Sequence, residues 1–458
     1  MPREPHPTEA VAATTATDAP APAPSPAPAP APAPAGARAS RRRTVFGTGI
    51  GNALEWYDWN IYAVFTPFFA PQFFPGSDPA SALMATLAIF AVGFLMRPLG
   101  GLVFGRLSDR KGRRIAMIVS VGLASAGSLV IGLAPTHATI GVGASVLLLV
   151  TRLVQGLAHG GELPAAQTYV SEMAPHGRRG RWSSLIYVSG TCGIVVGEVL
   201  AAILAGTLSE GQLHSWGWRV PFLVGGLIGA YALVTRMRLA ETEAFENQRK
   251  QGAATAAPRA SLWRDFRANR RACLRVVGIT LGGTVTYYTW VVSAPAQAIA
   301  VKDFDPEAAL WAGVLANLVF IAVLPLFGIL SDRVGRKPVM LLSYVGILVL
   351  TFPLDLLIRD QVWQLGVAMT IAMLFIAASS AILPTVYAEM FPTGMRTAGV
   401  AVPYAFAVAA CGGSAAYLQT WLGSQGLGHV FLLYTMALLL LAVVVIWRMP
   451  ETKDVELT

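Results

Sequence analysis

A ten-residue polar segment occurs twice in this chain, each time between long apolar stretches. Gly105-Arg-Leu-Ser-Asp-Arg-Lys-Gly-Arg-Arg114 returns as Gly328-Ile-Leu-Ser-Asp-Arg-Val-Gly-Arg-Lys337, 223 residues later. In the same order, a Glu-Met-x-Pro segment at Glu172 recurs at Glu389, and the Glu-Thr dipeptide at 241 recurs 210 residues on. Repeats at a nearly constant offset indicate a duplicated architecture, so we expect two homologous halves of roughly 200 residues each.

The composition places most of the chain in lipid. Of the 458 residues, 54% are hydrophobic and 13% are charged, with a mean hydropathy of +0.56, whereas charged residues approach about a quarter of a soluble domain. A helix needs about 20 apolar residues to cross the hydrocarbon core. Twelve segments meet this length and predict twelve transmembrane helices: 45–70, 82–104, 115–134, 140–172, 181–206, 217–238, 274–300, 307–330, 338–358, 362–390, 396–421 and 428–448.

The basic residues indicate how these segments are oriented. With both termini in the cytoplasm, cytoplasmic segments hold 29 of the 34 Lys and Arg residues, and the external loops hold only Arg219, Lys302 and Arg359. This is the positive-inside distribution of an inner (plasma) membrane protein with an even number of spans. The net charge of +9 therefore reports orientation, and we expect no nucleic-acid partner.

The predicted fold class is an all-α integral membrane protein, with two six-helix bundles related by an internal repeat. Residues 1–43 contain no apolar signal-peptide core and carry an Ala/Pro run, so we expect a disordered cytoplasmic tail. The three cysteines are isolated, which excludes a disulfide framework and a cysteine-based metal site. The predicted organisation is tail 1–43, first bundle 44–238, cytoplasmic linker 239–273, second bundle 274–448 and cytoplasmic tail 449–458.

Five sequence features together support a resemblance to a known family. They are Gly51-Asn-Ala-Leu-Glu-Trp-Tyr-Asp58, Phe94-Leu-Met-Arg-Pro-Leu-Gly-Gly101, Arg152-Leu-Val-Gln-Gly156 with Gly160-Gly-Glu162, Ser215-Trp-Gly-Trp-Arg-Val-Pro-Phe222, and the two Glu-Met-x-Pro motifs. With the basic signature after the second helix of each half, the chain resembles the major facilitator superfamily. Within it, the chain resembles the metabolite:proton symporters, which include oxoglutarate, shikimate, citrate and proline/betaine carriers. The resemblance implies a substrate site between the two bundles near mid-membrane, around which the bundles rock.

Ionisable residues inside the predicted spans are the first candidates for function, because a buried charge is costly unless it is paired or hydrated. In the first span, Asn52, Glu55 and Tyr62 lie on one helical stripe, with Asp58 about 60° around from Glu55. Two carboxylates this close repel each other, so one could hold a proton near neutral pH. The alternative is that one of them is permanently paired with an arginine of a neighbouring helix.

Arginines of the second and fourth spans could complete this site. The planar guanidinium of Arg97 suits bidentate binding of a substrate carboxylate, although Arg97 could instead be the structural partner of Glu55 or Asp58. A second polar stripe carries a histidine that is either a proton relay or a packing residue. The members of this stripe are Arg152, Gln155, His159 and Glu162. The family resemblance implies coupling or bundle packing for Arg152, and a neutral amide where this chain has Glu198.

The seventh span contributes aromatic and polar candidates. Tyr287, Tyr288, Trp290 and Gln297 could surround an organic substrate, or the aromatic rings could simply pack. The oxoglutarate carriers are expected to have a lysine near the position of Ala296. Its absence here counts against a dicarboxylate as the substrate.

The repeated cytoplasmic signature has a separate predicted role. Its charged residues could form ion pairs that are made in one state and broken in another, or they could only set topology. By family analogy, Asp109, Arg113 and Glu172 form an inner gate. Arg219 could attract anions or latch the outer face, or cap a helix. The remaining gating candidates are Arg110, Asp332, Arg333, Arg336 and Glu389.

Taken together, these features predict a secondary transporter that imports a small, oxoglutarate-like organic acid by proton symport with alternating access. The alternative is a proton-coupled carrier of a zwitterion such as proline or betaine, because aromatic faces can hold a quaternary ammonium group. We expect no enzyme activity, since no nucleophile–base or metal-ligand spacing occurs. The expected partners are the small-molecule substrate, protons and lipid. The expected driving force is the proton gradient, without a cofactor or a metal, in a protein that functions as a monomer.

Overall fold

The computed structural model describes residues 35–76, 78–111, 113–160, 162–175, 177–237, 262–392, 395–453 and 455. Residues 1–34 of the predicted tail and residues 239–261 of the predicted linker lie outside these ranges. Residues 45–458 form one compact unit, distinct from residues 1–44. Within the described ranges every regular element is a helix.

The first half of the chain forms long helices interrupted by short turns. Its elements are α1 (Ala35–Phe73), α2 (Pro79–Leu95), α3 (Arg97–Lys111), α4 (Arg113–Leu133), α5 (His137–Ile140), α6 (Gly143–His159), α7 (Glu162–Met173), α8 (Arg179–Thr207), α9 (Glu210–Gln212), the π-helix η1 (Leu213–Gly217) and α10 (Arg219–Met237).

The second half repeats this plan. Its elements are α12 (Leu262–Ala268), α13 (Arg270–Tyr287), the π-helix η3 (Tyr288–Val292), α14 (Ala294–Lys302), α15 (Pro306–Val334), α16 (Arg336–Leu357), α17 (Val362–Ser380), α18 (Leu383–Glu389), α19 (Arg396–Ser424) and α20 (Gly428–Arg448).

Nine helices among the described residues are long and apolar enough to cross a membrane. The three other predicted spans correspond to α1, to α6 with α7, and to α13 with α14. α1 carries buried carboxylates, and the other two segments are broken into shorter helices. The count of twelve spans stays a prediction.

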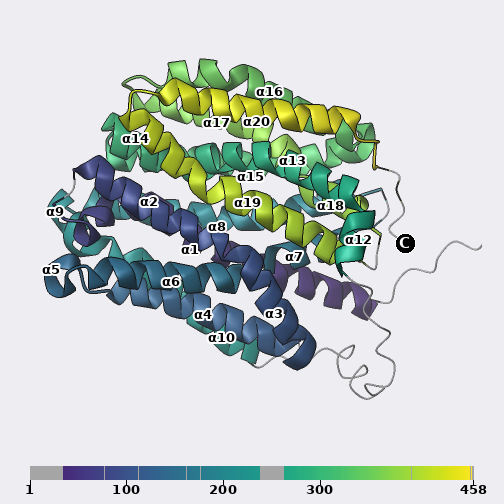
Figure 1. Ribbon diagram of the computed structural model, residues 1–458, viewed down its shortest axis with the longest axis horizontal. Helices are drawn as coiled ribbons and strands as arrows, with labels where there is room; N and C mark the ends of the chain where they lie inside the picture. Colours follow the sequence, from purple (N-terminus) through teal and green to yellow (C-terminus); the bar gives the residue numbers. More distant parts are fainter. Residues whose placement is uncertain are drawn as a thin grey trace, which may run out of the picture. The chain divides into compact units, whose positions relative to one another are not determined.

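Within residues 45–458, the two halves of the chain lie side by side (Figure 1). The purple and blue helices gather on one side, and the green and yellow helices on the other. α8 packs along α15, and α2 packs along α19, so each half contributes helices to the seam between them. The largest cluster of buried side chains contains residues from both halves.

The seventh predicted span is broken by a π-helical turn. The hydroxyl of Ser293 donates to the carbonyl of Tyr288 at 2.8 Å, and Pro295 in the first turn of α14 has no N–H to continue the helical ladder. π-helical turns inside helices are frequent at functional sites. This one contains Tyr288 and follows Tyr287, which are both buried at the seam between the halves.

Gly156 of α6 and Gly160, the residue that follows α6, allow the backbones of the second and fourth predicted spans to meet. A Cβ atom on Gly156 would lie 1.9 Å from the carbonyl oxygen of Gly93, and one on Gly160 would lie 2.0 Å from that of Arg97. Small residues are what lets membrane helices approach this closely. This backbone contact fixes the position of Arg97 along the axis of α6.

We predict that Gly156→Ala destabilises the protein, because the opposing backbone cannot move away as a side chain could. The expected loss is about 1–3 kcal/mol of unfolding free energy, the usual cost of overpacking, measured by thermal unfolding in detergent. Gly423→Ala is the control, since a Cβ there meets nothing within 4 Å. Equal melting temperatures for the two variants would contradict the close packing of α6.

Candidate binding and gating site

The two carboxylates of α1 lie in different surroundings. An oxygen of Glu55 lies 3.8 Å from a guanidinium nitrogen of Arg97, and both side chains are buried. The guanidinium of Arg97 also lies 4.4 Å from the ring centroid of Trp59 and 4.3 Å from that of Phe94. Such cation–π contacts help to hold a buried cation. Arg97 therefore lies between one carboxylate and two aromatic rings.

Asp58 contacts a different group of polar side chains. The hydroxyl of Ser128 donates to Asp58 at 2.9 Å, and the amide of Gln155 donates to Ser128 at 3.1 Å. Arg152, which is 1% exposed, stacks 3.7 Å from the ring centroid of Tyr62. The structure thus brings Asp58, Gln155, Arg152 and Tyr62 together in one half, with Ser128 as a member that the sequence did not single out.

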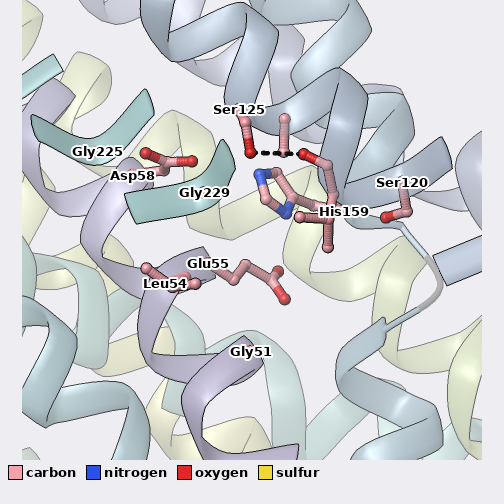
Figure 2. Close-up of a pocket in the computed structure, with 11 residues that line it drawn as sticks. Gly51, Leu54, Glu55, Asp58, Ser120, Ser125, His159, Gly225 and Gly229 are labelled. Atoms are coloured by element: carbon pink, nitrogen blue, oxygen red, sulfur yellow. Dashed lines mark hydrogen bonds between the residues drawn. The ribbon is translucent and has the colours of Figure 1, made fainter. Parts of the chain in front are cut away.

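His159 lies beside these carboxylates. It is 5% exposed, and neither of its ring nitrogens has a hydrogen-bond partner among the described residues. It lines a cavity together with Glu55 and Asp58, in which the imidazole lies between the two carboxylates and the serines of α4 (Figure 2). A buried polar group without a partner requires an explanation, such as bound water.

Other candidates of the first half contact α8 and the second half. Asn52 donates to the carbonyl of Ile186 at 2.7 Å, which ties α1 to α8. Glu198 is fully buried and accepts a hydrogen bond from Asn317 of α15 at 3.1 Å. Its other carboxylate oxygen has no hydrogen-bond partner in the described part of the chain. The side chain of Glu162 lies outside the described residues.

An aromatic cavity lies between the two halves. Trp56 of α1 meets Tyr287 edge-on, with ring centroids 5.2 Å apart, and stacks on Tyr288 at 6.1 Å. Tyr187, Tyr387 and Tyr404 also line this cavity. The sequence did not single out these three, because a tyrosine within an apolar span looks like a packing residue. The one available signal was the position of Tyr387, two residues before the repeated Glu389.

Two candidates of the seventh span lie away from this cavity. Gln297 donates to the hydroxyl of Thr420 at 2.9 Å, a contact within the second half. Trp290 is half-buried and packs on the apolar core. Neither lines the aromatic cavity.

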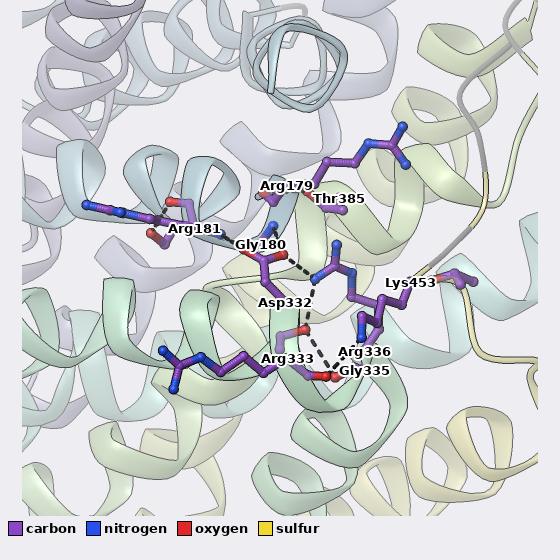
Figure 3. Close-up of polar contacts among 12 residues, drawn as sticks. Arg179, Gly180, Arg181, Asp332, Arg333, Gly335, Arg336, Thr385 and Lys453 are labelled. Atoms are coloured by element: carbon purple, nitrogen blue, oxygen red, sulfur yellow. Dashed lines mark hydrogen bonds and ion pairs between the residues drawn. The ribbon is translucent and has the colours of Figure 1, made fainter. Parts of the chain in front are cut away.

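The second copy of the repeated signature joins the two halves (Figure 3). The carboxylate of Asp332 accepts the backbone N–H groups of Gly180 at 2.8 Å and Arg181 at 3.0 Å, both in the first turn of α8. It also forms a 2.8 Å ion pair with Arg336. A carboxylate at a helix N-terminus satisfies unpaired N–H groups and complements the helix dipole. Asp332 therefore fastens α15 to α8.

Glu389 is the centre of a neighbouring group of charges. It lies 3.4 Å from Arg336 and 3.7 Å from Arg179, and it accepts the hydroxyl of Thr452 at 2.7 Å. Arg179 belongs to the first half, and the others belong to the second. A further ion pair between the halves joins Glu172 to Arg396 at 2.8 Å.

The remaining gating candidates lie elsewhere. Arg219 donates to the carbonyls of Gly132 and Ala134, at 3.0 and 2.6 Å, and so caps the C-terminal end of α4 within the first half. The side chain of Arg333 is exposed. The side chains of Asp109, Arg110 and Arg113 lie outside the described residues.

The second Glu-Thr dipeptide, to which the sequence assigned no role, caps α16. Glu451 accepts the backbone N–H groups of Arg336 at 2.8 Å and Lys337 at 3.0 Å. Partial burial alone would raise the pKa of the Glu451 carboxyl, but these and two further backbone N–H donors hold that pKa below its ordinary value of 4.5. The ionised carboxylate thus stabilises the end of the repeated signature.

We predict that Glu451→Gln lowers the stability of α16 by about 0.5–1 kcal/mol at neutral pH, the usual size of a charge effect at an exposed helix end. Because the pKa is lower in the folded state, this stabilisation is present above pH 4.5 and is lost as the pH falls through the folded-state value. Melting curves of wild type and variant in detergent should therefore converge in acid. A gap that widens below pH 4.5 would contradict the cap.

Two family models match the chain. The model described as Major Facilitator Superfamily matches residues 48–293, and the model described as Sugar (and other) transporter matches residues 242–458. The "Alpha-ketoglutarate permease" of Escherichia coli (strain K12) is 36% identical over 413 residues, which cover 89% of this chain and 93% of the relative. The "Proline/betaine transporter" of the same strain is 32% identical over 382 residues, which cover 81% of this chain and 76% of the relative.

Solved structures share the fold. A crystal structure of a D-xylose-proton symporter has a TM-score of 0.68 at 18% identity, covering 90% of this chain and 99% of that chain. The xylose transporter XylE from E. coli, in a partially occluded inward-open conformation, has a TM-score of 0.66 at 18% identity. The match covers 89% of this chain and 98% of that chain. The resemblance drawn from the sequence motifs is confirmed, and the chain belongs to the Major Facilitator Superfamily.

Proposed function

We propose that this protein imports a small organic acid together with protons, by alternating access between two bundles. The observation that carries the proposal is the Glu55–Arg97 pair. At 3.8 Å the pair is longer than a charge-assisted hydrogen bond of about 2.7–2.9 Å. A substrate carboxylate that binds the guanidinium bidentately therefore competes well with Glu55. Protonation of Glu55 removes its charge and frees Arg97 for the substrate, which links the two ligands.

The proposal includes the finer architecture. Two six-helix bundles, 44–238 and 274–448, are joined by the linker 239–273, and both tails lie in the cytoplasm. The distribution of Lys and Arg supports this orientation in the inner membrane. The protein works as a monomer and needs no cofactor other than the proton gradient. The named relatives, a permease and a proline/betaine transporter, support transport of a small molecule.

The charged groups at the inner end of the seam are the proposed inner gate. Asp332, Glu389 and Glu172 each contact the other half of the chain through Gly180, Arg179 and Arg396, respectively. Release of substrate to the cytoplasm requires these contacts to break. Because the side chains of Glu389 and Arg179 are buried, leaving either charge without a partner is costly, so the opening of this gate requires water to reach both groups.

Uptake by proteoliposomes tests the proposal. When the pH inside the proteoliposomes is higher than outside, the wild type should accumulate an organic acid. The external medium should become more alkaline when substrate is added. Arg97→Lys should lower uptake about tenfold, because an ammonium group cannot bind a carboxylate bidentately. Arg359→Lys, in an exposed position, is the control. Uptake that ignores the gradient would rule out symport, and normal uptake by Arg97→Lys would rule out bidentate binding.

The second candidate function, a zwitterion carrier, rests on the aromatic cavity and Glu198. Trp56 and Tyr288 present stacked rings, on which a quaternary ammonium group could lie. Glu198 is a buried carboxylate that forms no ion pair among the described residues, and it lies close enough to Tyr287 to interact with it. A cationic group of the substrate would compensate its charge, while Arg97 would bind the carboxylate.

For this candidate we predict that Glu198→Gln lowers proline or betaine uptake about tenfold, because the amide keeps the shape and removes the charge that compensates the cation. Uptake of an amine-free acid should be unchanged or increased. Glu210→Gln, on the exposed helix α9, is the control. The measurement is competition between labelled zwitterion and unlabelled acids in proteoliposomes. Equal zwitterion uptake by the variant and the wild type would exclude Glu198 from recognition of the cation.

A further inference from the structure

α1 separates two cavities. The first, which we name the first-half cavity, is lined only by residues of α1, α4, α6 and α10, so it lies inside one half of the chain. The second is the aromatic cavity, lined by Trp56 and Tyr187 of the first half and otherwise by the second half. Glu55 lines the first and Trp56 lines the second, and consecutive residues point about 100° apart on a helix. The helix itself is therefore the wall between the two cavities.

The two linings differ in chemistry. The first-half cavity has carboxylates from α1, hydroxyls of Ser120 and Ser125 from α4, and the imidazole of His159 from α6 (Figure 2). α10 contributes only glycines, so the cavity receives no charge from that side. The aromatic cavity is lined by rings and hydroxyls. Leu54, Val121 and Ala124 also line the first-half cavity, so its polar side chains are the carboxylates, hydroxyls and imidazole named above. Titratable lining groups suit water and protons, and an aromatic lining suits an organic substrate.

The environment of His159 is separate evidence, besides the cavity lining, that the first-half cavity binds water. The side chain is more than nine-tenths buried, and both ring nitrogens lack a hydrogen-bond partner among the described residues. A buried imidazole without partners costs free energy, and bound water is the usual remedy where the surroundings are polar. Asp58 and Ser125 face the same space (Figure 2).

The Glu55–Arg97 pair connects the two cavities. Glu55 lines the first-half cavity, while Arg97 stacks on Phe94 and interacts with the hydroxyl of Tyr288, a lining residue of the aromatic cavity. The charged neighbours of Glu55 and Asp58 include Arg97 of α3 and Arg152 of α6. Neither α4 nor α10 contributes a titratable lining residue.

We propose that protons reach and leave Glu55 and Asp58 through water in the first-half cavity, while the substrate occupies the aromatic cavity. This inference rests on the proposed proton symport and adds a separate route for the proton. The proton that binds the Glu55 carboxylate breaks its ion pair with Arg97, which then binds the substrate carboxylate. After the substrate leaves, Arg97 returns to Glu55, and the proton passes to water in the first-half cavity.

Filling the cavity tests the separation of routes. Ala124 of α4 lines the first-half cavity, whereas Ala126, two residues on, is exposed on the same helix. We expect Ala124→Leu to displace cavity water, and Ala124 is not a lining residue of the aromatic cavity. Ala126→Leu is the matched control. Where Ala124→Leu does not fold, judged by its melting curve, Ala124→Val takes its place.

Two assays in proteoliposomes separate the steps. Proton-driven accumulation requires the proton route, whereas counterflow, the exchange of labelled for unlabelled substrate without a gradient, requires only the substrate route. For the Ala124 variant we expect driven accumulation to fall about tenfold, the effect of a barrier higher by about 1.4 kcal/mol, with counterflow within about twofold of wild type. Ala126→Leu should match the wild type in both assays.

The other outcomes overturn the inference. If the folded Ala124 variant keeps wild-type driven accumulation, protons do not use this cavity, and the proposed symport stands. If it loses counterflow as well, the two routes are not separate. If the wild type itself shows counterflow but no proton-driven accumulation, the proposed symport fails and the proton route fails with it.

Discussion

The arrangement of this protein depends on how a few charges are held in hydrocarbon. An ionised side chain there costs several kcal/mol unless it has a partner, and the structure provides a different solution for each one. Glu55 has Arg97, Asp58 has Ser128, and Arg152 lies on the ring of Tyr62. All of these groups belong to the first half. The close backbone contact at Gly156 and Gly160 keeps the helices that carry both arginines in register, so the charges can meet.

The second half shares the fold of the first but not its chemistry. Its buried charges Arg336 and Glu389 lie at the end of the seam that carries the repeated signature. At the aromatic cavity it supplies instead the π-helical turn with Tyr288 and the rings of Tyr387 and Tyr404. Aromatic side chains can pack against Trp56 in more than one arrangement at little cost, whereas an ion pair cannot be broken cheaply in low dielectric. In the proposed alternating access, the aromatic side chains of the second half would move against the first half, which holds the buried charges.

The sequence predicted the features that stand out against an apolar background. The repeat predicted two halves, and Glu55, Asp58, Arg97 and Arg152 were visible because charges are rare within spans. Their partners were not predictable, because the rotation of each helix is set by packing. Ser128 pairs with Asp58, and Asn317 of the other half pairs with Glu198. The sequence is compatible with two roles for Arg219, a latch on the outer face and a helix cap. Its position at the end of α4 depends on a tertiary contact, which no local pattern predicts. Glu451 was noted only as part of a repeat, since helix capping across 115 residues leaves no local pattern.

The position of α1 supports the proposed separation of the proton route from the substrate site. The first-half cavity is bounded by four helices of the same half. Trp56 contacts Tyr287 and Tyr288 of the second half, whereas Asp58 and His159 line the cavity inside the first half. Arg97 contacts groups on both sides, through Glu55 and Tyr288. In the proposed mechanism, coupling between proton and substrate requires no long pathway, because the guanidinium of Arg97 would bind either the carboxylate of Glu55 or that of the substrate, depending on whether Glu55 holds a proton.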